Sequence, residues 1–83
     1  MELILEIATP GNGNIYEFQA DDSLTVGELK VLAAEEIDLL ERGRIALDPG
    51  RALLFHTRTR RVPEEELALP AAGIRGGDRL LLL

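Results

Sequence analysis

The segment LTVGELKVLAAEEIDLL, residues 24–40, marks a change of secondary structure, because the spacing of apolar residues changes here from every second position to a helical period. In an α-helix, residues three or four positions apart lie on the same face. We therefore expect an amphipathic helix that packs one apolar stripe against the rest of the chain. The stripe consists of Val26, Leu29, Ala33, Ile37 and Leu40.

Both ends of this helix carry sequence signals. Thr25, with Glu28 three residues later, forms a capping box in which each side chain can bond the backbone amide of the other residue. At the other end, Gly43 favours the left-handed conformation in which many helices stop. The sequence predicts a helix that begins at Thr25 and ends near Glu41–Arg42.

Two segments of alternating apolar residues precede the helix, at 2–8 (ELILEIA) and 15–20 (IYEFQA). Such alternation is typical of strands that bury one face. The connection TPGNGN, residues 9–14, is rich in turn-forming residues, so we expect a hairpin. The residues that share the predicted inner faces are Leu3, Leu5, Ile7, Tyr16, Phe18 and Ala20.

Residues 41–51 (ERGRIALDPGR) follow no clear period. Their apolar residues Ile45 and Leu47 indicate contact with the core. The tripeptide DPG at 48–50 predicts a turn, because proline fixes one backbone angle and glycine tolerates unusual ones.

The segment ALLFHTRTR, residues 52–60, alternates again and predicts a strand. We expect the face with Leu53, Phe55 and Thr57 to pack on the helix. The opposite face would then be exposed. Its members are Leu54, His56, Arg58 and Arg60.

The segment VPEEELALPAAGI, residues 62–74, contains two prolines and should be mostly irregular, with a short turn of helix allowed at 63–67. Its expected apolar anchors are Leu67, Leu69 and Ile74.

Residues 79–83 predict a last strand, in which Leu80 and Leu82 lie opposite Leu81 and Leu83. The whole order predicts one α+β domain over residues 1–83. It has a mixed sheet of four to five strands, with one main helix packed on one face.

The composition argues against several partners and chemistries. A net charge of −6 disfavours nucleic acids and anionic membranes, which select for clustered positive charge. The absence of cysteine excludes disulfides, thiolate nucleophiles and Cys-based metal sites, and it suits a reducing cytoplasm. No apolar run is long enough to span a membrane, and the first residues lack the positive region of a signal peptide.

The residue types that carry catalysis lack partners. His56 is the only histidine, and a lone histidine on a strand is more often a surface or partner-contact residue than a base or metal ligand. Ser23 lies beside the helix start, where a capping or turn role suffices. The acidic runs at 35–36 and 64–66 lack the opposed geometry of acid–base catalysis. We expect no enzyme activity, no metal and no cofactor.

Three short segments carry a resemblance to a known fold. LTVGELK (24–30) is similar to the helix-start segment of ubiquitin-like domains, and RALLFHTR (51–58) resembles the third strand of ubiquitin. GIRGGDRL (73–80) resembles the Gly-Ile-x-x-Gly-Asp turn that leads into the last ubiquitin-like strand. The chain thus resembles the ubiquitin-like β-grasp superfamily over essentially its whole length.

Within that superfamily, the chain most resembles the YukD/EsaB family, small bacterial proteins linked to type VII (ESX, WXG100) secretion systems. The GIRGGDRL segment carries most of this resemblance. It implies a cytoplasmic, non-catalytic component or regulator that binds other secretion components. A second interpretation is the cytosolic ubiquitin-like domain of a larger secretion membrane protein.

The pair Gly76-Gly77 raises a third interpretation, a sulfur carrier or protein modifier of the β-grasp class. Such proteins are activated at a C-terminal di-glycine, which must be an exposed, extended tail. Here DRLLLL follows the pair and fits a sheet strand better than a mobile tail. Gly77 can supply the positive φ of a tight turn before that strand, so we expect a turn and no conjugation.

Function would then depend on exposed apolar residues, which proteins seldom cluster without a reason. In ubiquitin the open sheet face is the main recognition surface, and the first and last strands are neighbours. The resemblance therefore implies a partner-binding patch on that face. The predicted patch consists of Ile4, Leu54, Leu81 and Leu83, with His56, Arg58 and Arg60 at its rim.

Other interpretations of this patch stay open. The loop at 41–51 could cover these leucines, the leucines could simply fill strand positions, or two copies could pair their open sheet faces in a homodimer with twofold symmetry. The arginines of HTRTRR, residues 56–61, allow either contact with an acidic partner or a solvated edge strand whose charges discourage aggregation.

Overall fold

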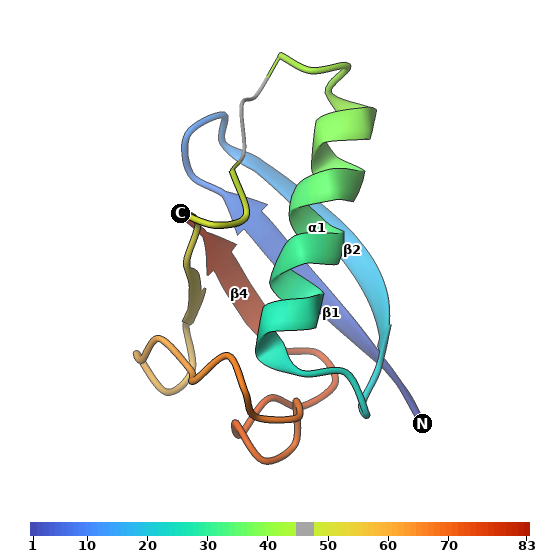
Figure 1. The fold of residues 1–83 in the computed structure, drawn as a ribbon, viewed down its shortest axis with the longest axis vertical. Helices are drawn as coiled ribbons and strands as arrows, with labels where there is room; N and C mark the ends of the chain where they lie inside the picture. Colours follow the sequence, from blue (N-terminus) through green and yellow to red (C-terminus); the bar gives the residue numbers. More distant parts are fainter. Residues whose placement is uncertain (45–47) are drawn as a thin grey trace.

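The computed structural model describes residues 1–44 and 48–83, so the predicted core contacts of Ile45 and Leu47 lie outside the described residues. Within the described part, four strands and one helix follow one another in the predicted order (Figure 1). The elements are β1 (Glu2–Thr9), β2 (Asn14–Asp21), α1 (Val26–Leu40), β3 (Leu54–His56) and β4 (Arg79–Leu82).

The strands form one mixed sheet with the spatial order β2-β1-β4-β3. β1 pairs antiparallel with β2, as the predicted hairpin requires, and parallel with β4. β3 lies antiparallel to β4 at the other edge. α1 crosses one face of the sheet, and no helix of the described chain covers the other face (Figure 1). This is the predicted α+β arrangement.

The core fills the space between α1 and the sheet. Leu3 and Tyr16 pack at its margin, whereas Leu40, which the sequence placed in the buried stripe, is 62% exposed. Leu40 lies beside β2, and in the described part of the chain no strand continues the sheet beyond β2 to cover it. The other predicted residues of these segments are buried: Leu5, Ile7, Phe18, Ala20, Val26, Leu29, Ala33, Ile37, Leu80 and Leu82.

The capping box at the start of α1 is confirmed. The Glu28 amide donates to the Thr25 hydroxyl at 3.1 Å, and the Thr25 amide donates to the Glu28 carboxylate at 2.9 Å. The backbone amides of Val26 and Gly27, which lie in the first turn and have no partner within the helix, donate to carbonyl groups of the segment that precedes β4, at 2.9 Å and 3.0 Å. The backbone N–H groups at the helix start therefore have hydrogen-bond partners both in the capping box and in a segment distant in sequence.

The end of α1 differs slightly from the prediction. The first left-handed residue is Arg42 (φ 54°), one position before Gly43, which is also left-handed (φ 73°). The Gly43 amide donates to the Asp38 carbonyl at 3.0 Å and the Arg42 amide to the Leu39 carbonyl at 3.2 Å. This is a Schellman motif with arginine at the position that glycine usually occupies. No helix in the described part of the chain is long and apolar enough to cross a membrane.

The prediction for residues 52–60 is wrong both in the length of the strand and in which of its side chains are buried. β3 covers only three residues, and its buried side chains are Leu54 (2% exposed) and His56 (0%), whereas Leu53 is 46% exposed. The register explains the difference, because Leu54 pairs with Leu82 and His56 pairs with Leu80. Residues opposite each other in an antiparallel pair point to the same face, and Leu80 and Leu82 face the core.

The segment between β3 and β4 is irregular, as predicted, and has turns rather than a helix at 63–67. Leu69 and Ile74 are fully buried anchors, and Leu67 is half-buried. A bridge between Thr25 and Ala68 holds the segment against the start of α1. The turn predicted at 48–50 is present, with the Gly50 amide bonded to the Asp48 carboxylate at 2.9 Å.

Candidate functional site

The pair Gly76-Gly77 forms a turn that is attached to β1. Gly77 has a φ of +87°, and its amide donates to the Ile4 carbonyl at 2.7 Å. The carbonyl of the next residue, Asp78, accepts from the Glu6 amide at 3.0 Å. The chain then continues as β4, so the prediction of a turn is confirmed.

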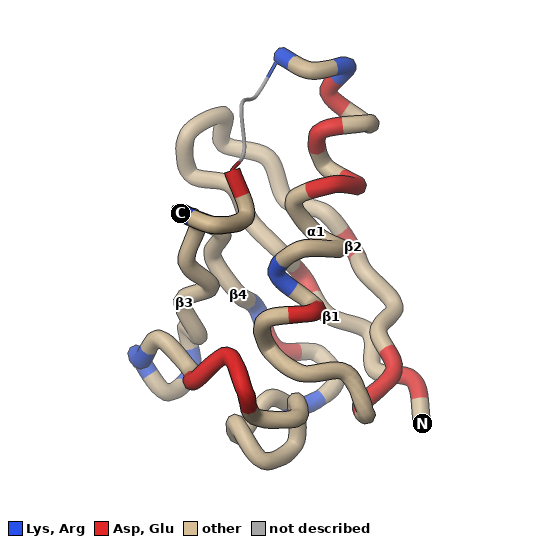
Figure 2. Tube along the Cα trace, in the orientation of Figure 1, with Lys and Arg blue, Asp and Glu red and all other residues tan. Residues whose placement is uncertain are grey.

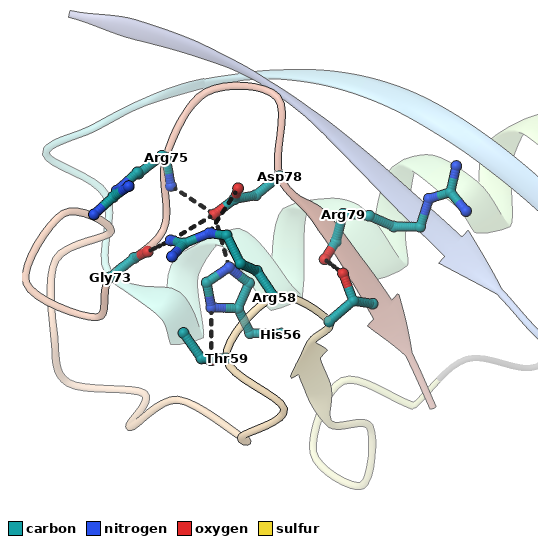
Figure 3. Close-up of polar contacts among 8 residues, drawn as sticks. His56, Arg58, Thr59, Gly73, Arg75, Asp78 and Arg79 are labelled. Carbon is teal, nitrogen blue, oxygen red and sulfur yellow. Dashed lines mark hydrogen bonds and ion pairs between the residues drawn. The ribbon is translucent and has the colours of Figure 1, made fainter.

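His56 lies at the centre of a polar cluster beneath this turn (Figure 3). Its Nε2 lies 2.7 Å from Oδ2 of Asp78, and its Nδ1 lies 3.0 Å from Oγ1 of Thr59. Both ring nitrogens therefore have partners, which a fully buried imidazole requires. The expectation that His56 is a surface residue at the rim of a binding patch is wrong, because its side chain has no exposed area.

The carboxylate of Asp78 contacts three residues, His56, Arg58 and Arg75. Arg58 donates to its two carboxylate oxygens from Nε and Nη2, both at 3.2 Å, and the Arg75 amide donates at 2.9 Å (Figure 3). Burial by itself raises the pKa of Asp78, but the hydrogen bonds from Arg58, the Arg75 amide and His56 outweigh it and lower the pKa to about 2. Asp78 is therefore ionised at all physiological pH values.

Arg58 is part of the same cluster, which differs from its predicted role at the rim of a patch. Besides Asp78, its Nη2 donates to the Gly73 carbonyl (Figure 3). Arg60 occupies the tight turn after β3 with a positive φ of 58°, and its amide donates to the His56 carbonyl at 2.8 Å. Arg58 thus links the end of β3 to the turn before β4.

Thr59, His56 and Asp78 follow the order hydroxyl, imidazole, carboxylate, which is the order of a catalytic triad. In a triad the carboxylate mainly orients the imidazole, whereas Asp78 also holds Arg58 and the Arg75 amide. The cluster is best explained as a structural feature, whose hydrogen bonds hold the end of β3 against the start of β4. Among the described residues, no group of histidine and acidic side chains is placed to hold a metal ion.

The open face of the sheet carries a row of apolar residues across all four strands. In the register, Ile15 of β2 lies opposite Ala8 of β1, Ala8 opposite Leu81 of β4, and Leu81 opposite Phe55 of β3. Two exposed leucines extend this row, because Leu53 and Leu83 exchange backbone hydrogen bonds of 3.0 Å and 2.9 Å. We call this set the sheet-face patch: Ile15, Leu53, Phe55, Leu81 and Leu83.

The sheet-face patch shares only part of the predicted one. Leu81 and Leu83 lie where expected, but Leu54 points into the core and is replaced by its neighbours Leu53 and Phe55. The side chain of Ile4 is half exposed on the same sheet face. However, the ion pair between Arg79 and Glu6, at 2.7 Å, separates Ile4 from Leu81.

Sequence reasoning missed Leu53 and Phe55 because three consecutive apolar residues, 53–55, allow either face to be buried. The signal that could have found them is the pairing of β3 with β4, because Phe55 pairs with Leu81, which was expected on the open face.

Comparisons with known proteins identify the fold. No protein-family model matches the chain, and no curated protein matches it. Ubiquitin of Caldiarchaeum subterraneum superposes with a TM-score of 0.73 at 19% identity, over 99% of this chain and 91% of that one. The ubiquitin-like domain of Plasmodium falciparum Dsk2 gives 0.73 at 14% identity, over the full length of both chains.

A third structure, of ATBAG1 in complex with HSP70, superposes with a TM-score of 0.74 at 12% identity. The match covers 98% of this chain and 39% of the matched chain of that complex. Identities this low establish the fold alone, and that fold is the ubiquitin-like β-grasp.

Proposed function

We propose that this chain is a non-catalytic, ubiquitin-like protein-interaction module that binds partner proteins through the sheet-face patch. One observation carries the proposal: five apolar side chains gather on a sheet face that no described helix covers. Contiguous exposed apolar surface is uncommon on monomers and usually marks a binding site.

Phe55 and Leu81 are the best candidates for the centre of the interface. Both are half-buried in the free chain, and they are direct neighbours in the pairing of β3 with β4. A partner that covers them displaces water from an apolar surface that is already ordered by the sheet. Binding energy commonly concentrates in a few residues at the centre of an interface, and a surface that is already ordered costs less conformational entropy to bind.

At a finer level, we propose a cytoplasmic component or regulator of a bacterial type VII secretion system, with secretion components as partners. This rests on the resemblance of GIRGGDRL, residues 73–80, to the YukD/EsaB family. The cytosolic domain of a larger secretion membrane protein is the alternative that the same resemblance allows. A sulfur carrier or modifier is less favoured, because Gly76-Gly77 lies in a turn bonded to β1 and does not form an extended tail.

The test is an affinity purification from lysate of the source organism, read by mass spectrometry. Wild type is compared with Leu53→Glu, in the sheet-face patch, and with Leu39→Glu as a matched control on the exposed side of α1. We expect partners that are retained by wild type and by Leu39→Glu and lost by Leu53→Glu. Secretion proteins among them support the finer proposal, whereas a covalent adduct with an adenylating enzyme would contradict the module.

Self-association is the second use of the same surface, through pairing of two open sheet faces. Sedimentation of the purified chain decides it. A dimer that Leu53→Glu dissociates and Leu39→Glu leaves intact would assign the patch to homodimerisation, and a monomer would leave it free for other proteins.

A further inference from the structure

Within the described residues, β2 forms a free edge of the sheet, because it pairs only with β1 in the order β2-β1-β4-β3. The strand has eight residues, NIYEFQAD, with none of the lysines or prolines that often block an edge. Its pairing with β1 continues without a bulge from Glu2↔Asp21 to Thr9↔Asn14. An extended chain would therefore meet a long and regular edge.

The register shows which backbone groups of β2 point outward. The Asp22 amide donates to the Met1 carbonyl at 2.9 Å, so the even-numbered residues of this strand bond toward β1. The odd-numbered residues Ile15, Glu17 and Gln19 then direct their N–H and C=O groups away from the sheet. No described segment of the chain pairs with them.

A groove lies between this edge and α1. The exposed side chain of Leu40 contributes apolar surface on the helix side. At the end of α1, the Tyr16 hydroxyl and the Asn14 side chain donate to the Glu41 carboxylate, which holds the helix against the strand. The groove is lined by Tyr16, Glu17, Phe18, Gln19, Glu36 and Leu40.

The charged residues of the two elements beside the groove, α1 and β2, are mainly acidic, and the acidic residues are red in Figure 2. β2 has no basic residue, and the only base of α1, Lys30, is buried and bonds Glu65 at 2.7 Å. The exposed acidic residues of the two elements are Glu17, Asp21, Glu28, Glu35 and Glu36.

We propose that this edge and its groove bind an extended segment of a partner protein in which apolar residues alternate with lysine or arginine. The segment adds to β2 as a strand, because its backbone can bond Ile15, Glu17 and Gln19. Its apolar side chains contact Leu40 on the helix side. Its basic side chains lie on the open sheet face, beside Glu17 and Asp21, where opposite charges across strands are favourable.

A second copy of the chain is a poorer occupant of this edge. Antiparallel pairing of β2 with itself would place the carboxylates of Glu17 and Asp21 from both copies on one sheet face. Like charges across strands are unfavourable, and no basic residue of β2 offsets them. The acidic edge therefore selects for a basic partner segment.

The test uses the full chain and labelled decapeptides, with binding read by fluorescence anisotropy. We expect a peptide of alternating valine and lysine to bind at least about tenfold more tightly than one of alternating valine and glutamate, and to weaken with salt. Glu17→Lys should reduce the affinity for the valine–lysine peptide about tenfold. The matched control Glu64→Lys, an exposed acid outside the groove, should not.

A further variant tests whether the edge of β2 binds independently of the sheet-face patch. Leu53→Glu should leave the affinity for the valine–lysine peptide unchanged. Equal affinities of the two peptides, or equal losses in Glu17→Lys and Glu64→Lys, would overturn the proposal. It would also be overturned if backbone N-methylation of the peptide did not reduce binding, since an added strand needs its N–H groups. A dimer of the chain that excludes the peptide would assign the edge to a second copy instead.

Discussion

At the scale of the single residue, Asp78 holds together parts of the chain that are far apart in sequence. Its carboxylate bonds His56, Arg58 and the Arg75 amide, and its backbone carbonyl bonds the Glu6 amide of β1. Removing the carboxylate would leave a fully buried imidazole without one of its partners. An unsatisfied buried polar group typically costs about 1–3 kcal/mol.

Asp78 also predicts the response of the fold to acid. Its pKa is lowered from 3.8 to about 2, so the unfolded chain binds a proton more readily than the folded one. The stabilisation, about 2 kcal/mol, is fully present above pH 4 and is lost as the pH falls from about 4 to about 2. Urea unfolding across this range should show the loss in wild type.

The matched variants for this measurement are Asp78→Asn and Asp48→Asn, the latter at an exposed carboxylate. Asp78→Asn should lower stability at pH 7 by about 2 kcal/mol and remove that part of the acid dependence. Asp48→Asn should keep the wild-type profile. Parallel acid profiles of wild type and Asp78→Asn would show that Asp78 is not the group that titrates.

At the scale of the secondary-structure element, the facing of β3 decides which residues reach a partner. Leu54→Glu buries a carboxylate in the core and should cost more than about 4 kcal/mol, enough to unfold a small domain. Leu53→Glu, one residue earlier, should change stability by less than about 1 kcal/mol. Thermal unfolding followed by circular dichroism compares the two. A folded Leu54→Glu and an unfolded Leu53→Glu would mean that the facing of β3 is reversed.

The end of α1 offers a second prediction at this scale. Arg42 holds the left-handed position of a Schellman motif, where a side chain is strained and glycine is not. Arg42→Gly should therefore stabilise the chain by about 0.5–1 kcal/mol, after the greater flexibility of glycine in the unfolded chain is subtracted. Arg44→Gly, outside the motif, should give no gain. A loss of stability in Arg42→Gly would contradict the strained geometry.

At the scale of the whole molecule, the fold was largely predictable, because the spacing of apolar residues within each segment indicates whether that segment is a strand or a helix. Alternation defined β1 and β2, the helical period with its capping box defined α1, and the leucine run defined β4. The turn at Gly76-Gly77 was predictable for the same reason, since a strand had to follow it.

The candidate site was less predictable, because it depends on contacts across the sheet. The sequence of β3 alone does not show that His56 meets Asp78, 22 residues later. It also does not show that Phe55 pairs with Leu81. Leu80 and Leu82 of β4 lie in the core, but a run of four leucines does not by itself show which alternate pair is buried; the pairing of β4 with β1 and β3 decides it. Pairing between distant strands, rather than local pattern, therefore decided which face of β3 is exposed.

We propose that partner proteins bind the open sheet face around Leu53, Phe55 and Leu81. The most direct measurement places a photo-crosslinking amino acid at position 53 in the source organism, with position 39 on the exposed side of α1 as control. We predict crosslinked partner proteins, identified by mass spectrometry, at position 53 and not at position 39. Equal crosslinking at both positions, or crosslinking at position 39 alone, would contradict the claim.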